Sequence, residues 1–169
     1  MTSTIRGVFL VGPYGSGKST VAIEICNIVE DRGWAYALLD LDYLAWANPS
    51  SHDVHEDPRL LLANLEAVVR NYRNAGIDHF VVAGYVPDGA ILDAIRAVLD
   101  VDLSVVRLDV DSAEIERRLR SDIDPRRLEE SERTAHCAAV FDPTDGIVIR
   151  NDRAPRTTAR QVMQAIGWG

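Results

Sequence analysis

Eight residues near the start of the sequence, Gly12 to Ser19, have the types and the spacing of a phosphate-binding loop. They read GPYGSGKS and match the pattern G-x-x-x-x-G-K-[ST] at every fixed position. Successive backbone N–H groups in such a loop, together with the start of the following helix, form a concave site for anions. The lysine is expected to reach the β- and γ-phosphates of a nucleoside triphosphate, and the serine hydroxyl to ligate Mg²⁺. The residues assigned to the nucleotide are Gly12, Gly15, Ser16, Gly17, Lys18, Ser19 and Thr20.

The flanks of the loop support this interpretation. Residues 5–11 form a short apolar run that is typical of a buried strand, and the apolar residues of 21–29 recur at helical spacing. Strand, glycine-rich turn and helix is the context that separates a phosphate loop from a chance match. The alternative is an ordinary glycine-rich turn, and for Thr20 a role in packing or capping the helix start.

Two carboxylates follow the second apolar run. Residues 34–39 are expected to form a strand that leads into Asp40-Leu41-Asp42. We assign Asp40 to the metal or its water, or to base duty, and Asp42 to the substrate hydroxyl, with the two side chains pointing to different sides or both turned inward. Phosphoryl transfer needs such groups to neutralise charge and to orient the acceptor. The alternative is a pair of solvated or turn-forming aspartates.

Strand and helix patterns alternate along the rest of the chain. Further strands are expected at about 79–83, 103–108 and 147–150, and helices at about 58–75, 88–99, 111–121 and 155–166, with a loop or partly ordered insert at 43–57. Such alternation predicts an α/β fold, a parallel sheet covered on both faces, with ligands at the carboxyl ends of the strands. Periodicity alone leaves the strand order open.

Composition narrows the classes of partner. The 169 residues are 47% hydrophobic and 26% charged, which is typical of one soluble domain, and the net charge is −8. An acidic chain argues against general affinity for nucleic acid or anionic membranes. Two distant cysteines suit a reducing compartment, and we find no signal segment and no membrane-spanning run. We therefore expect a cytoplasmic protein without nucleic-acid or membrane partners; the oligomeric state stays open.

With these features, the chain resembles the small-molecule kinases of the adenylate-kinase-like P-loop group. This group includes shikimate, gluconate and adenylylsulfate kinases and chloramphenicol phosphotransferase. The resemblance rests on the loop 12–19, Asp40-Leu41-Asp42, Ala83-Gly84, the arginine-rich segment after residue 116, and the run 149–155. It implies a P-loop NTPase three-layer sandwich with strand order 2-3-1-4-5. It also implies ATP and Mg²⁺ as cofactors and a single domain over 1–169, with a substrate-capping insert at about 43–75 and a lid at about 117–136.

The resemblance also suggests residues around the nucleotide. Arg117 and Arg120, then Arg126, are expected to close over ATP, with Arg120 stabilising the transferring phosphoryl group. Arg153 and Pro155 are expected to pack against the adenine. The alternatives are a solvated, salt-bridged helix face for the first three and a plain helix start for the last two.

One departure from the group bears on the acceptor. Ala83-Gly84 stands where adenylate kinases carry Asp-Gly, which weakens a nucleoside-monophosphate-kinase interpretation and favours a small molecule with a hydroxyl group. Trp46 and Tyr85 are candidates to line the acceptor site, with core packing as the alternative. The leading hypothesis is an ATP-dependent kinase with a small-molecule acceptor. The second is a nucleotide-binding switch or ATPase module without one.

Overall fold

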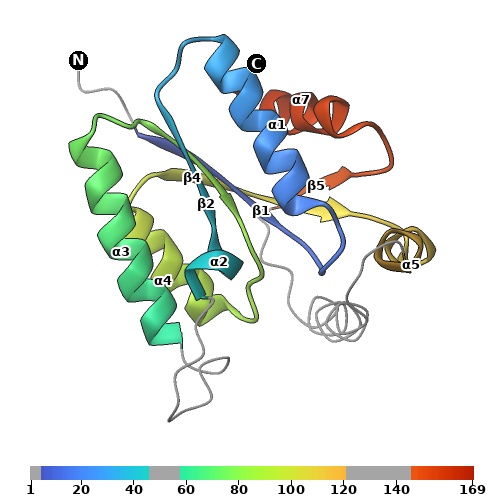
Figure 1. Ribbon diagram of the computed structural model, residues 1–169, viewed down its shortest axis with the longest axis horizontal. Helices are drawn as coiled ribbons and strands as arrows, with labels where there is room; N and C mark the ends of the chain where they lie inside the picture. Colours follow the sequence, from blue (N-terminus) through green and yellow to red (C-terminus); the bar gives the residue numbers. More distant parts are fainter. Residues whose placement is uncertain (1–4, 46–57, 121–145) are drawn as a thin grey trace.

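A twisted parallel sheet forms the centre of the structure (Figure 1). The computed structural model describes residues 5–45, 58–120 and 146–169. Within them the strands are β1 (Arg6–Val11), β2 (Tyr36–Asp40), β3 (His79–Ala83), β4 (Asp102–Asp109) and β5 (Ile147–Arg150). All neighbouring pairs are parallel, in the order β2-β3-β1-β4-β5. The α/β class and the expected strand order are confirmed.

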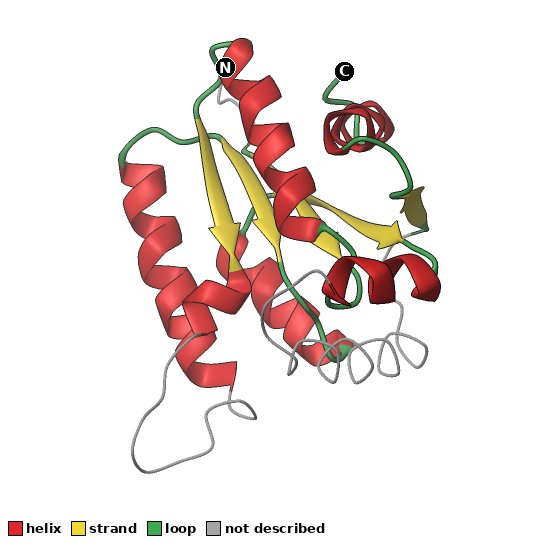
Figure 2. Ribbon diagram, turned by 45° about the vertical axis from the view of Figure 1, so that its right-hand side comes forward, coloured by secondary structure: helices red, strands yellow, loops and turns green. Residues whose placement is uncertain are grey.

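Helices cover both faces of this sheet, which confirms the three-layer arrangement (Figures 1 and 2). Helices α1 (Lys18–Asp31) and α7 (Pro155–Ala165) lie on one face, and α3 (Pro58–Asn74) and α4 (Gly89–Leu99) on the other. Two short helices follow strands: α2 (Leu41–Ala45) comes directly after β2, and α5 (Ser112–Arg120) comes after β4. Both short helices therefore lie at the carboxyl edge of the sheet.

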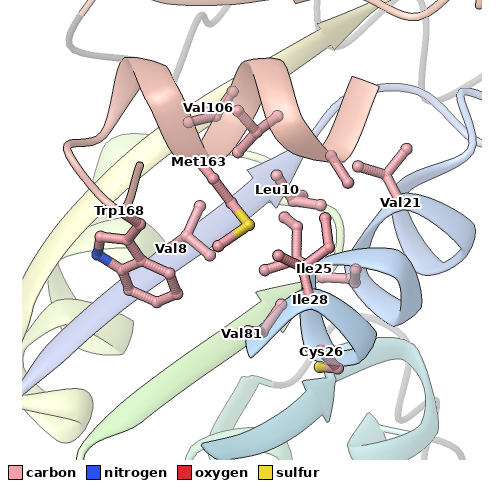
Figure 3. Packing of buried hydrophobic residues seen from close by; sticks show 14 of the residues in the cluster. Val8, Leu10, Val21, Ile25, Cys26, Ile28, Val81, Val106, Met163 and Trp168 are labelled. Atoms are coloured by element: carbon pink, nitrogen blue, oxygen red, sulfur yellow. The ribbon is translucent and has the colours of Figure 1, made fainter. Parts of the chain in front are cut away.

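Alternation of side chains along the central strands builds two hydrophobic cores. In β1, Val8 and Leu10 pack with α1 and α7, whereas Phe9 and Val11 pack with α3 and α4. Figure 3 shows the first core, where side chains from α1, α7 and the strands meet and Met163 of α7 lies beside β1. Helices cover both faces of the parallel sheet, so side chains on both sides of its central strands are buried. This explains why these strands are continuous apolar runs in the sequence. None of the described helices is both long and apolar enough to cross a membrane.

Some element boundaries differ from the expectation. Strand β2 begins at Tyr36, two residues later than expected, and the ring of Trp34 before it stacks on the His79 ring at 4.6 Å between centroids. Residues 41–45 are helical where a strand end and a loop were expected, so that part of the prediction was wrong. Asp88 precedes α4 as its N-cap and accepts from the Ile91 N–H at 3.0 Å.

Candidate active site

The loop between β1 and α1 brings the motif residues to the carboxyl edge of the sheet. Strand β1 ends at Val11 and α1 begins at Lys18, with Gly17 as its N-cap residue in the left-handed region at φ 89°. The Ser16 N–H donates to the Pro13 carbonyl at 3.1 Å, which closes a turn inside the loop. The structure thus has the strand, turn and helix that a phosphate loop requires.

Lys18 lies at the mouth of this loop and is largely buried. Its ammonium donates to the Gly12 carbonyl at 3.0 Å and to the Pro13 carbonyl at 3.1 Å. Burial lowers the pKa of Lys18, while the nearby carboxylates of Asp42 and Asp40 act in the opposite direction. Because this buried ammonium has little contact with water, an anion placed beside it would stabilise its charge. This favours the binding of a phosphate next to Lys18.

Asp40 and Ser19 join the end of β2 to the start of α1. The Ser19 hydroxyl donates to Asp40 Oδ2 at 2.7 Å, and the backbone N–H of Asp42 donates to Asp40 Oδ1 at 3.1 Å. Residues i and i+2 of a strand share a face, so strand geometry is no reason for the two aspartates to point apart. The chain changes from strand to helix at Leu41 instead, which places Asp42 in the first turn of α2.

These oxygen atoms fit a hard divalent cation. Mg²⁺ is usually held by one or two protein oxygens together with phosphates and water, and Ser19 and Asp40 present a hydroxyl and a carboxylate side by side. The loop also contains the Ser16 hydroxyl, which is fully buried and has no hydrogen-bond partner among the described residues. A buried polar atom of this kind requires a partner, and a bound phosphate oxygen would supply one.

The arginines of α5 divide between two faces of the helix. Arg117 pairs with Glu114 and Arg120 with Glu116, and both arginine side chains are 73% exposed. Hydrogen bonds from Arg117 and then Arg118 lower the pKa of Glu114 to about 2, so that carboxylate is ionised near neutral pH. The two first-choice arginines, Arg117 and Arg120, are exposed to solvent, and the third candidate, Arg126, lies outside the described residues.

Arg118, which was not among those choices, turns inward instead. Its guanidinium donates to the Asn151 carbonyl at 2.9 Å and approaches the Ser16 carbonyl at 3.5 Å. The signal was present in the sequence, because Arg118 follows Glu114 at i, i+4 and neighbours the inward Ile115 and Leu119 on the helix. Arg118 is therefore the α5 arginine that contacts the loop.

The remaining candidates lie at the edges of the site. Thr20 is exposed in the first turn of α1. Tyr85 is half-buried and lies two residues after Ala83, the last residue of β3. Arg153 is exposed, with Nε 3.9 Å from Asp152, and Pro155 is the exposed first residue of α7. Trp46 lies outside the described residues.

Neither protein-family models nor curated proteins match this sequence. Solved structures do match over nearly the full length. A sugar kinase from Janibacter sp. HTCC2649 is 18% identical, with 96% of this chain and 94% of that chain covered and a TM-score of 0.69. A tunicamycin resistance protein from Deinococcus radiodurans is also 18% identical, with 96% and 95% covered and a TM-score of 0.69. An APS kinase from Mycobacterium tuberculosis, in complex with AMPPNP and APS, is 21% identical, with 97% and 98% covered and a TM-score of 0.63. The chain has the α/β fold of small-molecule P-loop kinases.

Proposed function

We propose that this protein is an ATP-dependent kinase that transfers the γ-phosphoryl group of Mg-ATP to a hydroxyl group of a small molecule. The observation that carries the proposal is the 2.7 Å contact between the Ser19 hydroxyl and Asp40. It brings the carboxylates that follow β2 to the start of the helix that follows the phosphate loop. Any Mg²⁺-dependent P-loop protein can use a serine and an aspartate in this way, and the group that favours transfer to an acceptor is the second carboxylate, Asp42, in the first turn of α2.

The phosphates occupy the loop in this proposal. The backbone N–H groups of residues 12–17 and the start of α1 bind them, and Lys18 contacts the β- and γ-phosphates. Lys18 would then exchange its present acceptors, the Gly12 and Pro13 carbonyls, for phosphate oxygens that carry full negative charge. Ser19 and Asp40 would hold Mg²⁺, which would neutralise the charge that develops on the transferring group.

The acceptor lies on the opposite side of the carboxylates from the loop. Asp42 orients the acceptor hydroxyl, and either Asp40 or Asp42 takes its proton as the bond to phosphorus forms and the bond to the ADP oxygen breaks. We place the acceptor-binding insert at 43–75, with Trp46 and Tyr85 beside it. Arg120 and Arg117 begin the lid segment 117–136, and Arg153 and Pro155 flank the base.

Cys26, a buried free thiol, is compatible with a reducing cytoplasm.

The structural neighbours support a small-molecule acceptor in particular. The proteins described above include a sugar kinase and an APS kinase, and each spans the same length as this chain.

An acceptor screen tests the proposal. The purified protein is incubated with Mg-ATP and pools of sugars, nucleosides, hydroxy acids and hydroxylated antibiotics, and ADP release is compared with the rate in water alone. We expect one chemical class to raise ADP release and to yield a product heavier by one phosphoryl group. The Asp42→Asn variant should lose this stimulation. If every pool leaves ADP release at the hydrolytic rate, the kinase proposal is wrong and the nucleotide-binding module remains.

A further inference from the structure

Asn151 is a buried polar residue directly after β5, and its backbone N, backbone O, Nδ2 and Oδ1 each have a hydrogen-bond partner. It is 4% exposed. Its backbone N–H donates to the Asp109 carbonyl at 2.8 Å, and its own carbonyl accepts from Arg118 at 2.9 Å. Its side-chain Nδ2 donates to the Ser16 carbonyl at 2.8 Å, and its Oδ1 accepts from the Thr158 hydroxyl at 2.9 Å. Asn151 thereby joins β4, α5 and α7 to the phosphate loop.

The contact with Ser16 has a fixed direction. A backbone carbonyl can only accept, so the amide nitrogen of Asn151, and not its oxygen, must face Ser16. The guanidinium of Arg118 approaches the same carbonyl at 3.5 Å. Two donors from separate elements thus hold the Ser16 carbonyl on the side of β5 and α7.

This arrangement determines where the next N–H group points. The described chain contains no cis peptide bonds, so the C=O of Ser16 and the N–H of Gly17 point in opposite directions across one planar peptide unit. Holding the carbonyl toward Asn151 turns the Gly17 N–H away from it, toward the side on which the proposed nucleotide site places the phosphates. If this peptide unit were rotated by about 180°, the Ser16 carbonyl oxygen would face the phosphates. Its partial negative charge would then repel the phosphate oxygens.

Gly17 allows Asn151 to come this close to the loop, and it also leaves the Ser16–Gly17 peptide in need of an external hydrogen bond to fix its orientation. A Cβ at this residue would lie 2.7 Å from Asn151 Nδ2, so only glycine admits the asparagine this close. Its φ of 89° lies in the left-handed region, which glycine adopts readily and residues with a Cβ adopt only with strain. A glycine also leaves the peptide before it free to rotate unless something else holds it.

We propose that Asn151, supported by Arg118, is a positioning residue that locks the Ser16–Gly17 peptide in the orientation that binds phosphate. The inference rests on the proposed nucleotide site and adds a residue from the far end of the chain to it. Asn151 itself need not touch the ligand. Its effect is exerted through the direction of one backbone N–H group.

Two substitutions separate this role from simple packing. Asn151→Asp keeps the shape but replaces the donor by a second acceptor, which repels the Ser16 carbonyl. Asn151→Ala removes the donor without adding repulsion, but it leaves a larger void. Packing alone predicts that the alanine variant binds phosphate more weakly than the aspartate variant, because it loses more contacts. The lock predicts the reverse order. Because the charge of the aspartate also repels phosphate directly, the lock further requires that the uncharged alanine variant lose affinity.

The probes are inorganic pyrophosphate and ADP, titrated calorimetrically against the wild type and each variant. Pyrophosphate has no base or ribose, so it reports the loop alone. We expect Asn151→Asp to weaken both ligands by about tenfold or more and Asn151→Ala by about threefold, since a lost donor to a buried carbonyl typically costs this much. The control is Asn27→Asp on the exposed surface of α1, which makes the same chemical change away from the phosphate loop. It should leave pyrophosphate affinity unchanged.

The outcomes distinguish the lock from the function on which it rests. If the wild type binds neither pyrophosphate nor ADP, the nucleotide site and the lock both fail. If the wild type binds but Asn151→Asp binds equally well, or better than Asn151→Ala, the lock alone is wrong and the kinase proposal stands. Should Asn151→Asp not fold, the alanine variant decides: pyrophosphate affinity equal to wild type overturns the lock, and a loss that Asn27→Asp does not share supports it.

Discussion

Replacing Asp40 by asparagine is the most specific test of the link between the phosphate loop and the carboxylates at the end of β2. The substitution keeps the size of the side chain. An asparagine oxygen can still accept from the Asp42 N–H, which now reaches Asp40 Oδ1 at 3.1 Å. The bond from the Ser19 hydroxyl to Asp40 Oδ2, at 2.7 Å, changes character, because the acceptor loses its charge or is replaced by an NH₂ group. The perturbation is therefore confined to one charge and one hydrogen bond.

The expected magnitude follows from that bond. A hydrogen bond to a charged acceptor contributes about 1.5–3 kcal/mol, which corresponds to roughly 10- to 150-fold in an equilibrium or rate constant. If Asp40 also serves as the base, the loss in kcat reaches about 10²- to 10⁴-fold. In the protein without nucleotide this bond is exposed to solvent and is worth less, so the free energy of unfolding should fall by only about 1 kcal/mol.

The assay compares binding with turnover. ADP affinity is measured by calorimetry with and without Mg²⁺, and ADP release is measured with Mg-ATP. We expect Asp40→Asn to keep the metal-free ADP affinity, to lose most of the gain that Mg²⁺ gives, and to lower kcat. The matched control is Asp102→Asn, an exposed residue at the opposite, amino-terminal end of β4. If Asp40→Asn retains both the gain from Mg²⁺ and the turnover of the control, Asp40 has no part in the metal site.

Three further predictions concern single residues. Lys18→Ala should lower turnover by at least about 10³-fold while the protein remains folded by circular dichroism; near-normal turnover would remove the loop from the mechanism. Gly84→Ala places a Cβ 2.8 Å from Leu41 Cβ, so we expect urea denaturation to show a loss of about 1–3 kcal/mol, and an unchanged midpoint would contradict the close packing of α2 on β3. Burial, followed by the charge of Glu30, raises the pKa of Cys26 from 9.0 to about 12. The unfolded chain then loses this proton first, so the free energy of unfolding should fall between about pH 9 and pH 12, and Cys26→Ala should flatten that slope; equal slopes would refute it.

The fold was predictable from the sequence because its signals are local. Residues 12–19 fix a loop by identity at set positions, and the apolar runs before and after it specify strands and helices. The expected strand order came from the resemblance to P-loop kinases, and the structure confirms it. The short helix α2 was missed because five residues carry too weak a helical signal, and its first residue, Leu41, is buried by packing against Gly84.

The site was predictable only in part, because its contacts join distant residues. Asp40 and Ser19 were assigned to one site on the ground that strand ends converge, and the structure brings them together. The choice of Arg117 over Arg118 depended on helix rotation, which the inward Ile115 could have indicated. The run 149–155 contributed to the resemblance, but nothing local in it singles out Asn151 as a partner of the phosphate loop. Its partner Ser16 is 135 residues away, and only the assembled sheet makes them neighbours.

The destination of the γ-phosphoryl group tests the central claim most directly. The protein is incubated with Mg-ATP and the acceptor class found by screening in ¹⁸O-labelled water, and the products are analysed by ³¹P NMR and mass spectrometry. The account predicts a phosphate ester without ¹⁸O in amounts equal to ADP, and loss of that ester in Asp42→Asn. If all of the released phosphoryl group is found as ¹⁸O-labelled orthophosphate, the protein hydrolyses ATP and does not transfer its phosphate, and the kinase account is contradicted.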